Sequence, residues 1–294
     1  MSEQTHNHRG ASPVPGGEFA FTWADFRQIA EFVHGEAGIM LPDSKANLVY
    51  SRLGKRLRAI GLRSFRDYCA LIESSDGVDE RQALIAAMTT NVTRFFRESH
   101  HFDHLASNVL PDLAAAARRG EKIRIWSSAC SSGEEPYSIA LTLLSVMPDA
   151  GDHDILILAS DIDPDILARA QDGAHPSTRL GDIPPSMRGR WIETDRSAPK
   201  PTFQFADPVR KLIRFRQLNL LKEWPLKASF QVIFCRNVMI YFDQETQNAI
   251  WARFADRMPL GGHVYIGHSE RIATETLPFS LVAQTTYKRT GGKG

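Results

Sequence analysis

Apolar residues in the first third of the chain recur with the period of amphipathic helices. Between residues 19 and 87 they stand three or four positions apart, which places them on one face of a helix. No strand pattern interrupts them, so we expect an all-helical domain over 19–87. Residues 1–18 are polar and rich in Gly, Pro and His, and we expect a disordered tail there. The predicted buried faces are Phe26, Ile29, Ala30 and Val33, and Leu48, Leu53, Leu57 and Ile60.

After a helix expected at 105–119, short apolar runs alternate with helical periods. This alternation predicts a mostly parallel sheet with helices on both faces, in one α/β domain over 108–290. Prolines break the pattern between 173 and 216, where we expect a small β-subdomain, about 186–217, at the sheet edge. The expected strands lie within 123–126, 154–161, 212–221, 230–235, 259–267 and 280–288.

The stretch IRIWSSACSSGEEPYSIA (123–140) reads as a strand, a loop of small residues and a helix. This is the layout of a nucleotide-type site at the edge of a parallel sheet. A phosphate loop would need Gly-Lys-Ser/Thr, and a dinucleotide fingerprint would need three spaced glycines. Glu134 and Glu135 at the helix start instead suit a cationic or amino group, such as those of S-adenosylmethionine (SAM). The alternative is a βα turn that serves sheet packing alone.

An acidic residue ends the second expected strand. In Rossmann-like folds a carboxylate at this place accepts hydrogen bonds from ribose hydroxyls. Asp161 is our candidate for that role, with an ordinary loop carboxylate as the alternative. Asp163 stands just before Pro164 and is expected to be a helix N-cap.

The segment 88–107 is too aromatic and too rich in cations for an ordinary linker. We interpret it as an interdomain segment that closes over a ligand, with Asn91 and Arg97 pointing inwards. The adjacent His100 and His101 lack a carboxylate–histidine pattern such as HExxH, so we predict no metal site.

Basic residues gather between Arg52 and Arg66, where acidic residues are scarce. A solvated helix face would explain such a run, and so would docking of an acidic partner. We favour docking, by a face of Arg52, Lys55, Arg56 and Arg63. No aromatic residue interleaves with them before Phe65, which argues against single-stranded nucleic acid.

Composition narrows the class of protein further. A formal net charge of +1 provides no global field for nucleic acid or membrane. The three cysteines are widely spaced and form neither a metal-ligand pair nor a disulfide framework, which favours a reducing compartment. No apolar run has the length of a membrane span, and the polar start lacks a secretory signal. We therefore expect a cytoplasmic protein.

The motifs taken together resemble the CheR family of chemotaxis-receptor protein-glutamate O-methyltransferases. The resemblance runs from about residue 19 to 288. It implies an all-α N-terminal domain, a Rossmann-like SAM-dependent methyltransferase domain and a small inserted β-subdomain. The motifs that carry it are TTNVTRFFRESHHF, IRIWSSACSSGEEPYSIA, ASDID, LNLL, FCRNVMIYFD and GGHVYIGHSE.

The resemblance also implies roles for residues. Asn91, Thr93 and Arg97 would contact SAM from the interdomain segment. Glu134 would hold the amino acid part of SAM, Asp161 its ribose, and Asn219 and Leu220 its adenosine side. The transfer site would be lined by Arg236, Asn237 and Tyr241.

The implied reaction converts receptor glutamates into glutamyl methyl esters and SAM into S-adenosylhomocysteine. Its partners would be acidic cytoplasmic helices of chemotaxis receptors, docked on the basic helix. Arg97 and Tyr241 would align the reacting groups, and a carboxylate that is already ionised needs no general base. We expect a monomer that inserts in no membrane and binds no nucleic acid.

Two departures and two alternatives accompany this resemblance. The segment 186–211 does not match the loop with which some relatives bind a receptor's C-terminal pentapeptide, and the SAM loop reads Ser131-Ser132-Gly133 where Ser-Thr-Gly is expected.

A nucleic acid methyltransferase would need a pocket for a flipped base, and no stacking cluster adjoins 234–242. A non-catalytic adaptor that binds SAM is the alternative from outside the enzymes.

Overall fold

The computed structural model describes residues 12–14, 16–89, 91–195 and 201–291. Contacts between Cα atoms divide the chain into two compact units. The first is Met1–Thr90 with Tyr241–Asp243, and the second is Asn91–Ile240 with Gln244–Gly294. Most of the tail expected at 1–18 lies outside the described residues. No helix in the described ranges combines the length and apolarity needed to cross a membrane.

The first unit is built from four helices: α1 (Trp23–Ala37), α2 (Ala46–Ile60), α3 (Phe65–Glu73) and α4 (Val78–Met88). Helix α1 begins with a capping box in which Thr22 and Asp25 accept each other's backbone N–H. Phe26, Ile29 and Val33 are buried as the sequence predicts. Ile60 was expected in the core and is exposed instead, because the buried face of α2 runs through Val49, Leu53 and Leu57.

A buried carboxylate ties three helices of this unit together. Glu80 of α4 is 7% exposed and accepts hydrogen bonds from the Tyr68 hydroxyl (2.9 Å) and from Arg56 Nε and Nη2 (3.1 and 2.6 Å). Arg52 Nη1 donates to the carbonyls of Ala87 and Thr89 at the end of α4. Two of the four predicted docking residues, Arg52 and Arg56, thus make contacts inside the unit.

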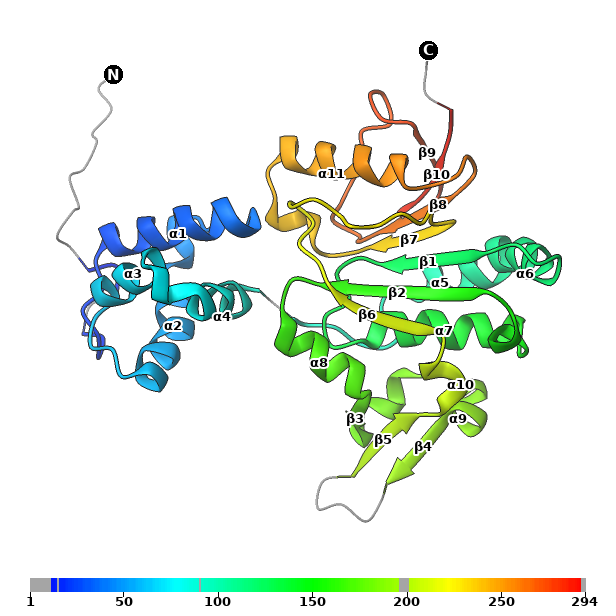
Figure 1. Ribbon diagram of the computed structural model, residues 1–294, viewed down its shortest axis with the longest axis horizontal. Coiled ribbons are helices and arrows are strands. Elements are labelled where there is room, and N and C mark those ends of the chain that lie inside the picture. Colours follow the sequence, from blue (N-terminus) through cyan, green and yellow to red (C-terminus); the bar gives the residue numbers. More distant parts are fainter. Residues whose placement is uncertain (1–11, 15, 90, 196–200, 292–294) are drawn as a thin grey trace. The chain divides into compact units, whose positions relative to one another are not determined.

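The second unit is organised around a seven-stranded sheet (Figure 1). Its order is β6-β2-β1-β7-β8-β10-β9; β10 is antiparallel to both β8 and β9, and the other neighbouring strands are parallel. The segment 280–288, expected as one strand, is a hairpin that turns at Thr285, whose φ is +48°. The strands are β1 (Ile123–Ser127), β2 (Ile155–Asp161), β6 (Ile213–Gln217), β7 (Val232–Cys235), β8 (His263–Ile266), β9 (Phe279–Ala283) and β10 (Thr286–Arg289).

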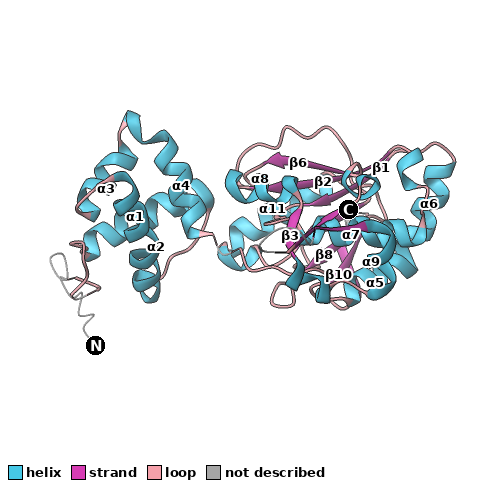
Figure 2. Cartoon of the chain, turned by 90° about the horizontal axis from the view of Figure 1, so that it is seen from below, coloured by secondary structure: helices cyan, strands magenta, loops and turns pink. Residues whose placement is uncertain are grey.

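Helices cover both faces of this sheet. Successive strand residues point to opposite faces, so Ile125 and Trp126 of β1 mark the two sides. Ile125 shares a core with residues of α6 (Leu110–Arg118), α7 (Glu134–Val146) and α8 (Pro164–Asp172). The ring of Trp126 packs against Trp224 and against Phe254 of α11 (Gln244–Asp256). All the strands drawn in Figure 2 belong to this unit.

The helix expected at 105–119 is present, but it begins earlier and contains a π-helical turn. Helix α5 (His100–His104) leads into a π-helical turn, Leu105–Val109, and α6 begins only at Leu110. Pro111 follows directly, and proline is tolerated at the start of a helix because its missing N–H would have no partner there.

A second, three-stranded sheet forms the inserted β-subdomain. Its order is β3-β5-β4, with strands β3 (Ala174–Pro176), β4 (Ile192–Asp195) and β5 (Thr202–Phe205). Short helices α9 (Pro185–Trp191) and α10 (Asp207–Arg210) lie beside these strands in the sequence. The predicted range 186–217 is wrong at both ends: the subdomain includes β3, and β6 pairs with β2 in the large sheet. The fold is thus the expected α/β sheet with an inserted β-subdomain and an all-α unit before it.

Glu80 provides a test of the helical unit. Glu80→Ala removes the acceptor for Tyr68 and the charge that neutralises Arg56, so we expect the free energy of unfolding to fall by about 2–3 kcal/mol. Urea unfolding of the full chain, followed by circular dichroism, measures the change. Asp79→Ala, at the exposed neighbouring position, is the control and should cost about 0.5 kcal/mol or less. Equal losses in both variants would contradict the assigned role.

Candidate functional site at the carboxyl edge of the sheet

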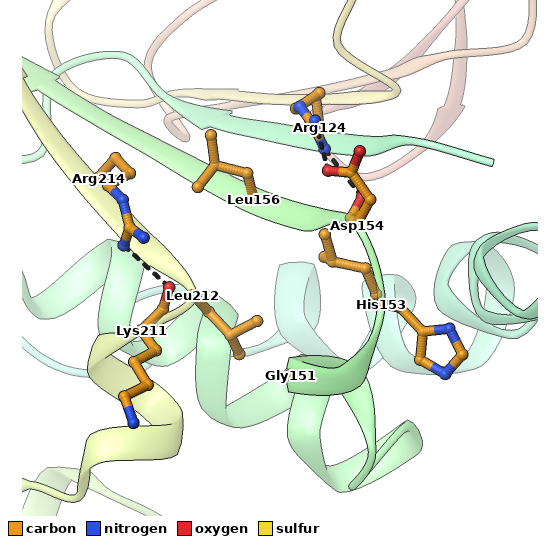
Figure 3. A pocket seen from close by; sticks show the side chains of 9 residues that line it. Arg124, Gly151, His153, Asp154, Leu156, Lys211, Leu212 and Arg214 are labelled. Atoms are coloured by element: carbon orange, nitrogen blue, oxygen red, sulfur yellow. Dashed lines mark hydrogen bonds and ion pairs between the residues drawn. The ribbon is translucent and has the colours of Figure 1, made fainter. Parts of the chain in front are cut away.

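A cavity of about 390 Å³ lies near the amino ends of β1 and β2 (Figure 3). The charges around it are engaged within the protein. Arg124 pairs with Asp154 (2.6 Å), and Arg214 Nη1 donates to the carbonyls of Lys211 and Ile213. We therefore do not place the functional site there. The lining residues are Arg124, Gly151, His153, Asp154, Ile155, Leu156, Lys211, Leu212 and Arg214.

Most of the predicted site residues converge instead at the opposite edge. The parallel strands β1, β2, β6 and β7 all end there, and open α/β sheets bind ligands outside the carboxyl ends of their strands. The loop 128–133 follows β1, Asp161 ends β2, Asn219 follows β6, and Arg236 follows β7.

The loop after β1 is shaped by its small residues. Ser131 and Gly133 have positive φ angles of 48° and 98°. A Cβ atom on Gly133 would lie 3.1 Å from the Cβ of Ala170 and 3.2 Å from the Tyr137 ring, and the positive φ would strain it, so this position favours glycine. Small side chains of this kind allow a ligand to approach a backbone closely.

Asp161 fastens this loop to the end of β2. Its carboxylate is 7% exposed and accepts the N–H groups of Ser131 (2.8 Å) and Asp163 (3.1 Å), one on each oxygen. Burial raises the pKa of Asp161, and these backbone hydrogen bonds oppose the rise. Each carboxylate oxygen has a second lone pair, so Asp161 can still accept ligand hydroxyls. Asp163 is the N-cap of α8, as predicted, and accepts the N–H groups of Asp165 and Ile166.

The segment after Thr90 reaches this loop. Asn91 Nδ2 lies 3.4 Å from Asp163 Oδ2, and the Ser131 hydroxyl donates to the Asn91 carbonyl. The Thr93 carbonyl accepts from Arg179 of the β-subdomain region. Asn91 is thereby brought beside the loop after β1, and Thr93 beside Arg179.

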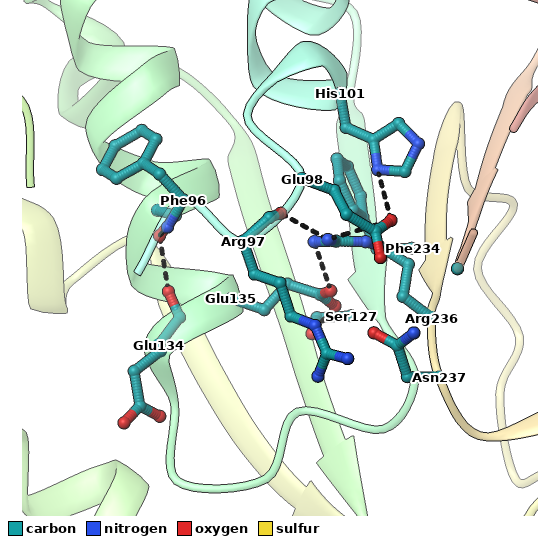
Figure 4. Close-up of polar contacts among 12 residues, drawn as sticks. Phe96, Arg97, Glu98, His101, Ser127, Glu134, Glu135, Phe234, Arg236 and Asn237 are labelled. Atoms are coloured by element: carbon teal, nitrogen blue, oxygen red, sulfur yellow. Dashed lines mark hydrogen bonds and ion pairs between the residues drawn. The ribbon is translucent and has the colours of Figure 1, made fainter. Parts of the chain in front are cut away.

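The two glutamates at the start of α7 differ in their surroundings. Glu134 accepts the Ser132 hydroxyl (2.6 Å) on one oxygen. Glu135 accepts the Ser127 hydroxyl (2.7 Å) and pairs with Arg236 Nη1 (3.2 Å). Burial raises the pKa of Glu135, and the Arg236 charge opposes the rise. In Figure 4 the Glu134 side chain points away from this pair.

Arg236 is the centre of a buried ion network (Figure 4). Its side chain is 3% exposed and contacts Glu135, Glu98 (3.4 Å) and the main-chain carbonyl of Arg97. Burial alone would raise the pKa of Glu98, but the Arg236 charge and a contact with His268 outweigh burial and lower it. Sequence reasoning missed Glu98 and Glu135 as partners of Arg236, because these contacts join segments that are 101 and 139 residues apart in the chain.

A second buried carboxylate organises the turn after β7. Glu270 is 3% exposed and accepts the N–H groups of Asn237, Val238 and Met239 at 2.9–3.1 Å, as well as that of Gly267. Asn237 has a positive φ of 59°. Glu270 was not predicted, although an acid just after a strand, in GHSE, was a possible signal.

The residues after β6 turn back on themselves. Asn219 Oδ1 accepts the N–H of Leu221 (2.9 Å), and the Leu220 carbonyl accepts from Trp224 Nε1 and Arg253 Nη1. Both residues stand at the carboxyl edge, as predicted. Tyr241 is different: it clusters with the helical unit, where its carbonyl accepts the N–H of Met40 (3.0 Å). The structure does not group it with the other predicted site residues.

Glu98, His100 and His101 each offer one potential metal-ligand atom, and these atoms lie within 4.8 Å of one another. The Arg236 guanidinium already neutralises Glu98, which opposes a second cation. His101 is fully buried, lies 2.7 Å from the Thr285 hydroxyl, and has its pKa lowered to about 3 by burial. We assign no metal to this group.

Comparison with known proteins places the chain in a family. Residues 24–89 match the all-alpha domain of CheR methyltransferases, and residues 91–288 match their SAM-binding domain. The chain belongs to the CheR methyltransferase family. SAM is therefore its cofactor, as the sequence predicted, and the expected fold class is confirmed.

Relatives resemble the chain over most of their length. A probable chemotaxis protein methyltransferase of Rhizobium etli is 51% identical over 88% of this chain and 97% of its own. Chemotaxis protein methyltransferase 2 of Pseudomonas aeruginosa is 41% identical over 94% and 97%, respectively. The chemotaxis protein methyltransferase of Escherichia coli is 39% identical over 91% of both chains.

His101 provides a test of the site's electrostatics. Below a pH of about 6.5 the unfolded chain protonates this histidine, whereas the folded protein keeps it neutral down to about pH 3. The free energy of unfolding should therefore fall on acidification, by about 1.4 kcal/mol per pH unit for this residue. His101→Gln should flatten the pH dependence between 4 and 6 by about that slope, in urea unfolding at several pH values. His34→Gln, at an exposed ring of the helical unit, is the control; an unchanged slope in His101→Gln would contradict the assignment.

Proposed function

We propose that this CheR methyltransferase methylates glutamate side chains of chemotaxis receptors, giving glutamyl methyl esters and S-adenosylhomocysteine. One observation carries the proposal. Arg97 is half-buried beside the carboxyl edge and pairs with no carboxylate among the described residues; its Nη1 donates only to the Val92 carbonyl (2.9 Å). Such a guanidinium suits an incoming carboxylate. The names of the relatives supply the chemotaxis context.

The residues at the carboxyl edge fit SAM. The loop 128–133 admits a ligand to its backbone, and the buried Asp161 keeps free lone pairs for ribose hydroxyls. Glu134 would hold the amino acid part, and Asn219 and Leu220 would border the adenosine. Asn91, Thr93 and Arg97 would close over it from the segment 88–107.

The chemistry needs positioning more than proton transfer. SAM, when bound, supplies an electrophilic methyl group on a sulfonium. A glutamate side chain is ionised at neutral pH, so no residue of this chain has to remove a proton. Arg97 would orient the incoming carboxylate, and Asn237 would line the transfer site; the role predicted for Tyr241 stays a prediction. A well-aligned site that excludes water favours the meeting of opposite charges.

The helical unit would dock the receptor. Lys55 and Arg63 are exposed and remain available for acidic cytoplasmic helices of receptors, whereas Arg52 and Arg56 stabilise the unit itself. The protein would act as a cytoplasmic monomer, recruited to receptor arrays without inserting in the membrane.

The reaction is tested with tritiated SAM and membranes that contain the cognate receptors. Label on a receptor-sized band that alkali releases as methanol establishes a carboxyl ester; base-stable label on nucleic acid would instead favour a nucleic acid methyltransferase.

Arg97→Ala should lower kcat/KM about 100-fold, and Asp161→Asn should weaken SAM binding about tenfold by calorimetry. Arg118→Ala and Asp112→Ala, at exposed positions, are the controls. Full turnover in Arg97→Ala would contradict its role, and SAM binding without any turnover would favour the adaptor.

Docking is tested by charge reversal. Lys55→Glu combined with Arg63→Glu should raise the KM for receptor about tenfold and leave kcat unchanged, because only encounter with the acidic helix is affected. The KM of the variant should also depend less steeply on salt. Lys122→Glu, an exposed charge just before β1, is the control. An unchanged KM for receptor would remove the docking role.

A further inference from the structure

The backbone on both sides of Arg97 adopts an unusual conformation. Phe96 and Glu98 have positive φ angles of 51° and 57°, in the left-handed region that residues with a Cβ rarely occupy. Such conformations persist where the surrounding structure holds them, and they gather at functional sites. The conformation of this tripeptide decides where the Arg97 side chain lies.

Each residue of the tripeptide is held by at least one contact (Figure 4). The Phe96 N–H donates to the Ser138 hydroxyl (3.0 Å). The Arg97 carbonyl accepts from Arg236 Nη2. The Glu98 carboxylate lies 3.4 Å from Arg236 Nη2 and 3.0 Å from His268 Nδ1.

Arg236 can serve as an anchor because its own charge is fixed from two sides. Glu98 comes from the strained tripeptide, and Glu135 comes from the first turn of α7. Glu135 is in turn fixed by the Ser127 hydroxyl at the end of β1 (2.7 Å). The Phe102 ring, with its centroid 5.8 Å from the guanidinium carbon, borders a third side. Removing either carboxylate would leave a buried cation half-compensated and free to shift.

We propose that Glu98, Glu135 and Arg236 are positioning residues that hold the backbone of Arg97, so that its guanidinium reaches the methyl-transfer site. The Arg97 side chain donates to the Val92 carbonyl and has no carboxylate partner in the described part of the chain. Its placement therefore depends on its backbone. The proposal deepens the proposed function, because it rests on Arg97 acting in that site.

The competing explanation is that the network only stabilises the fold. The positioning explanation and the structural explanation predict different results when a substitution in the network is combined with Arg97→Ala. A residue that acts through Arg97 loses its effect once Arg97 is gone, whereas a merely structural residue costs the same factor in either background.

The experiment measures kcat and KM for receptor methylation, SAM affinity by calorimetry, and Tm for four proteins: wild type, Glu98→Gln, Arg97→Ala and the double variant. We expect Glu98→Gln to lower kcat/KM about 10- to 100-fold, as for a misplaced catalytic side chain. In the Arg97→Ala background the same change should cost less than about threefold. Glu121→Gln, which alters an exposed pair with Arg119, is the matched control and should keep full activity.

Equal fold-losses in the two backgrounds, or full activity of Glu98→Gln, would overturn the proposal. If Glu98→Gln does not fold, Ser138→Ala replaces it, because this change releases the Phe96 N–H without exposing a buried charge. If the wild type transfers no methyl group to any receptor, the proposed function fails. SAM affinities of the same four proteins then test the positioning role alone, since Arg97 is assigned to SAM as well.

Discussion

A guanidinium buried at the end of a central strand must be neutralised within the protein, and this constraint organises the site. Arg236 follows β7, where it is nearly inaccessible to water. Its two carboxylate partners arrive from the segment before α5 and from the start of α7. Because a buried charge without compensation is costly, these segments are held in one arrangement, and the loop that carries Arg97 is fixed with them.

Buried carboxylates also accept hydrogen bonds from backbone N–H groups. Asp161 accepts the N–H of Ser131 in the loop after β1 and that of Asp163 after β2, and Glu270 accepts those of the turn after β7. Turns that approach a ligand cannot complete their hydrogen bonds with a neighbouring strand, so side chains must accept from them. Asp161 can hold the backbone and still contact ribose as proposed, since a carboxylate has more lone pairs than the three backbone hydrogen bonds that it accepts.

The helical unit shows how a charge run divides between packing and recognition. Arg56 lies against a carboxylate of α4 and Arg52 against carbonyls that end the same helix, while Lys55 and Arg63 stay in solvent. Within α2, Arg52 and Arg56 stand one turn apart on the side that contacts α4, whereas Lys55 faces water; Arg63 lies beyond the end of the helix. Counting basic residues by their helical spacing therefore overestimates the positive charge that is available to a partner.

The sequence by itself determined the elements and their chemistry: the helical first unit, the α/β alternation, the small-residue loop, the cap at Asp163 and the motifs of the family. These follow from periodicity and from neighbours a few residues apart. Only the tertiary structure decided which charges meet. It assigned β6 to the large sheet, turned the last strand into a hairpin at Thr285, and joined Arg236 to Glu98 and Glu135. The physical reason is that pairing between distant segments depends on sheet order and burial, which no local pattern records.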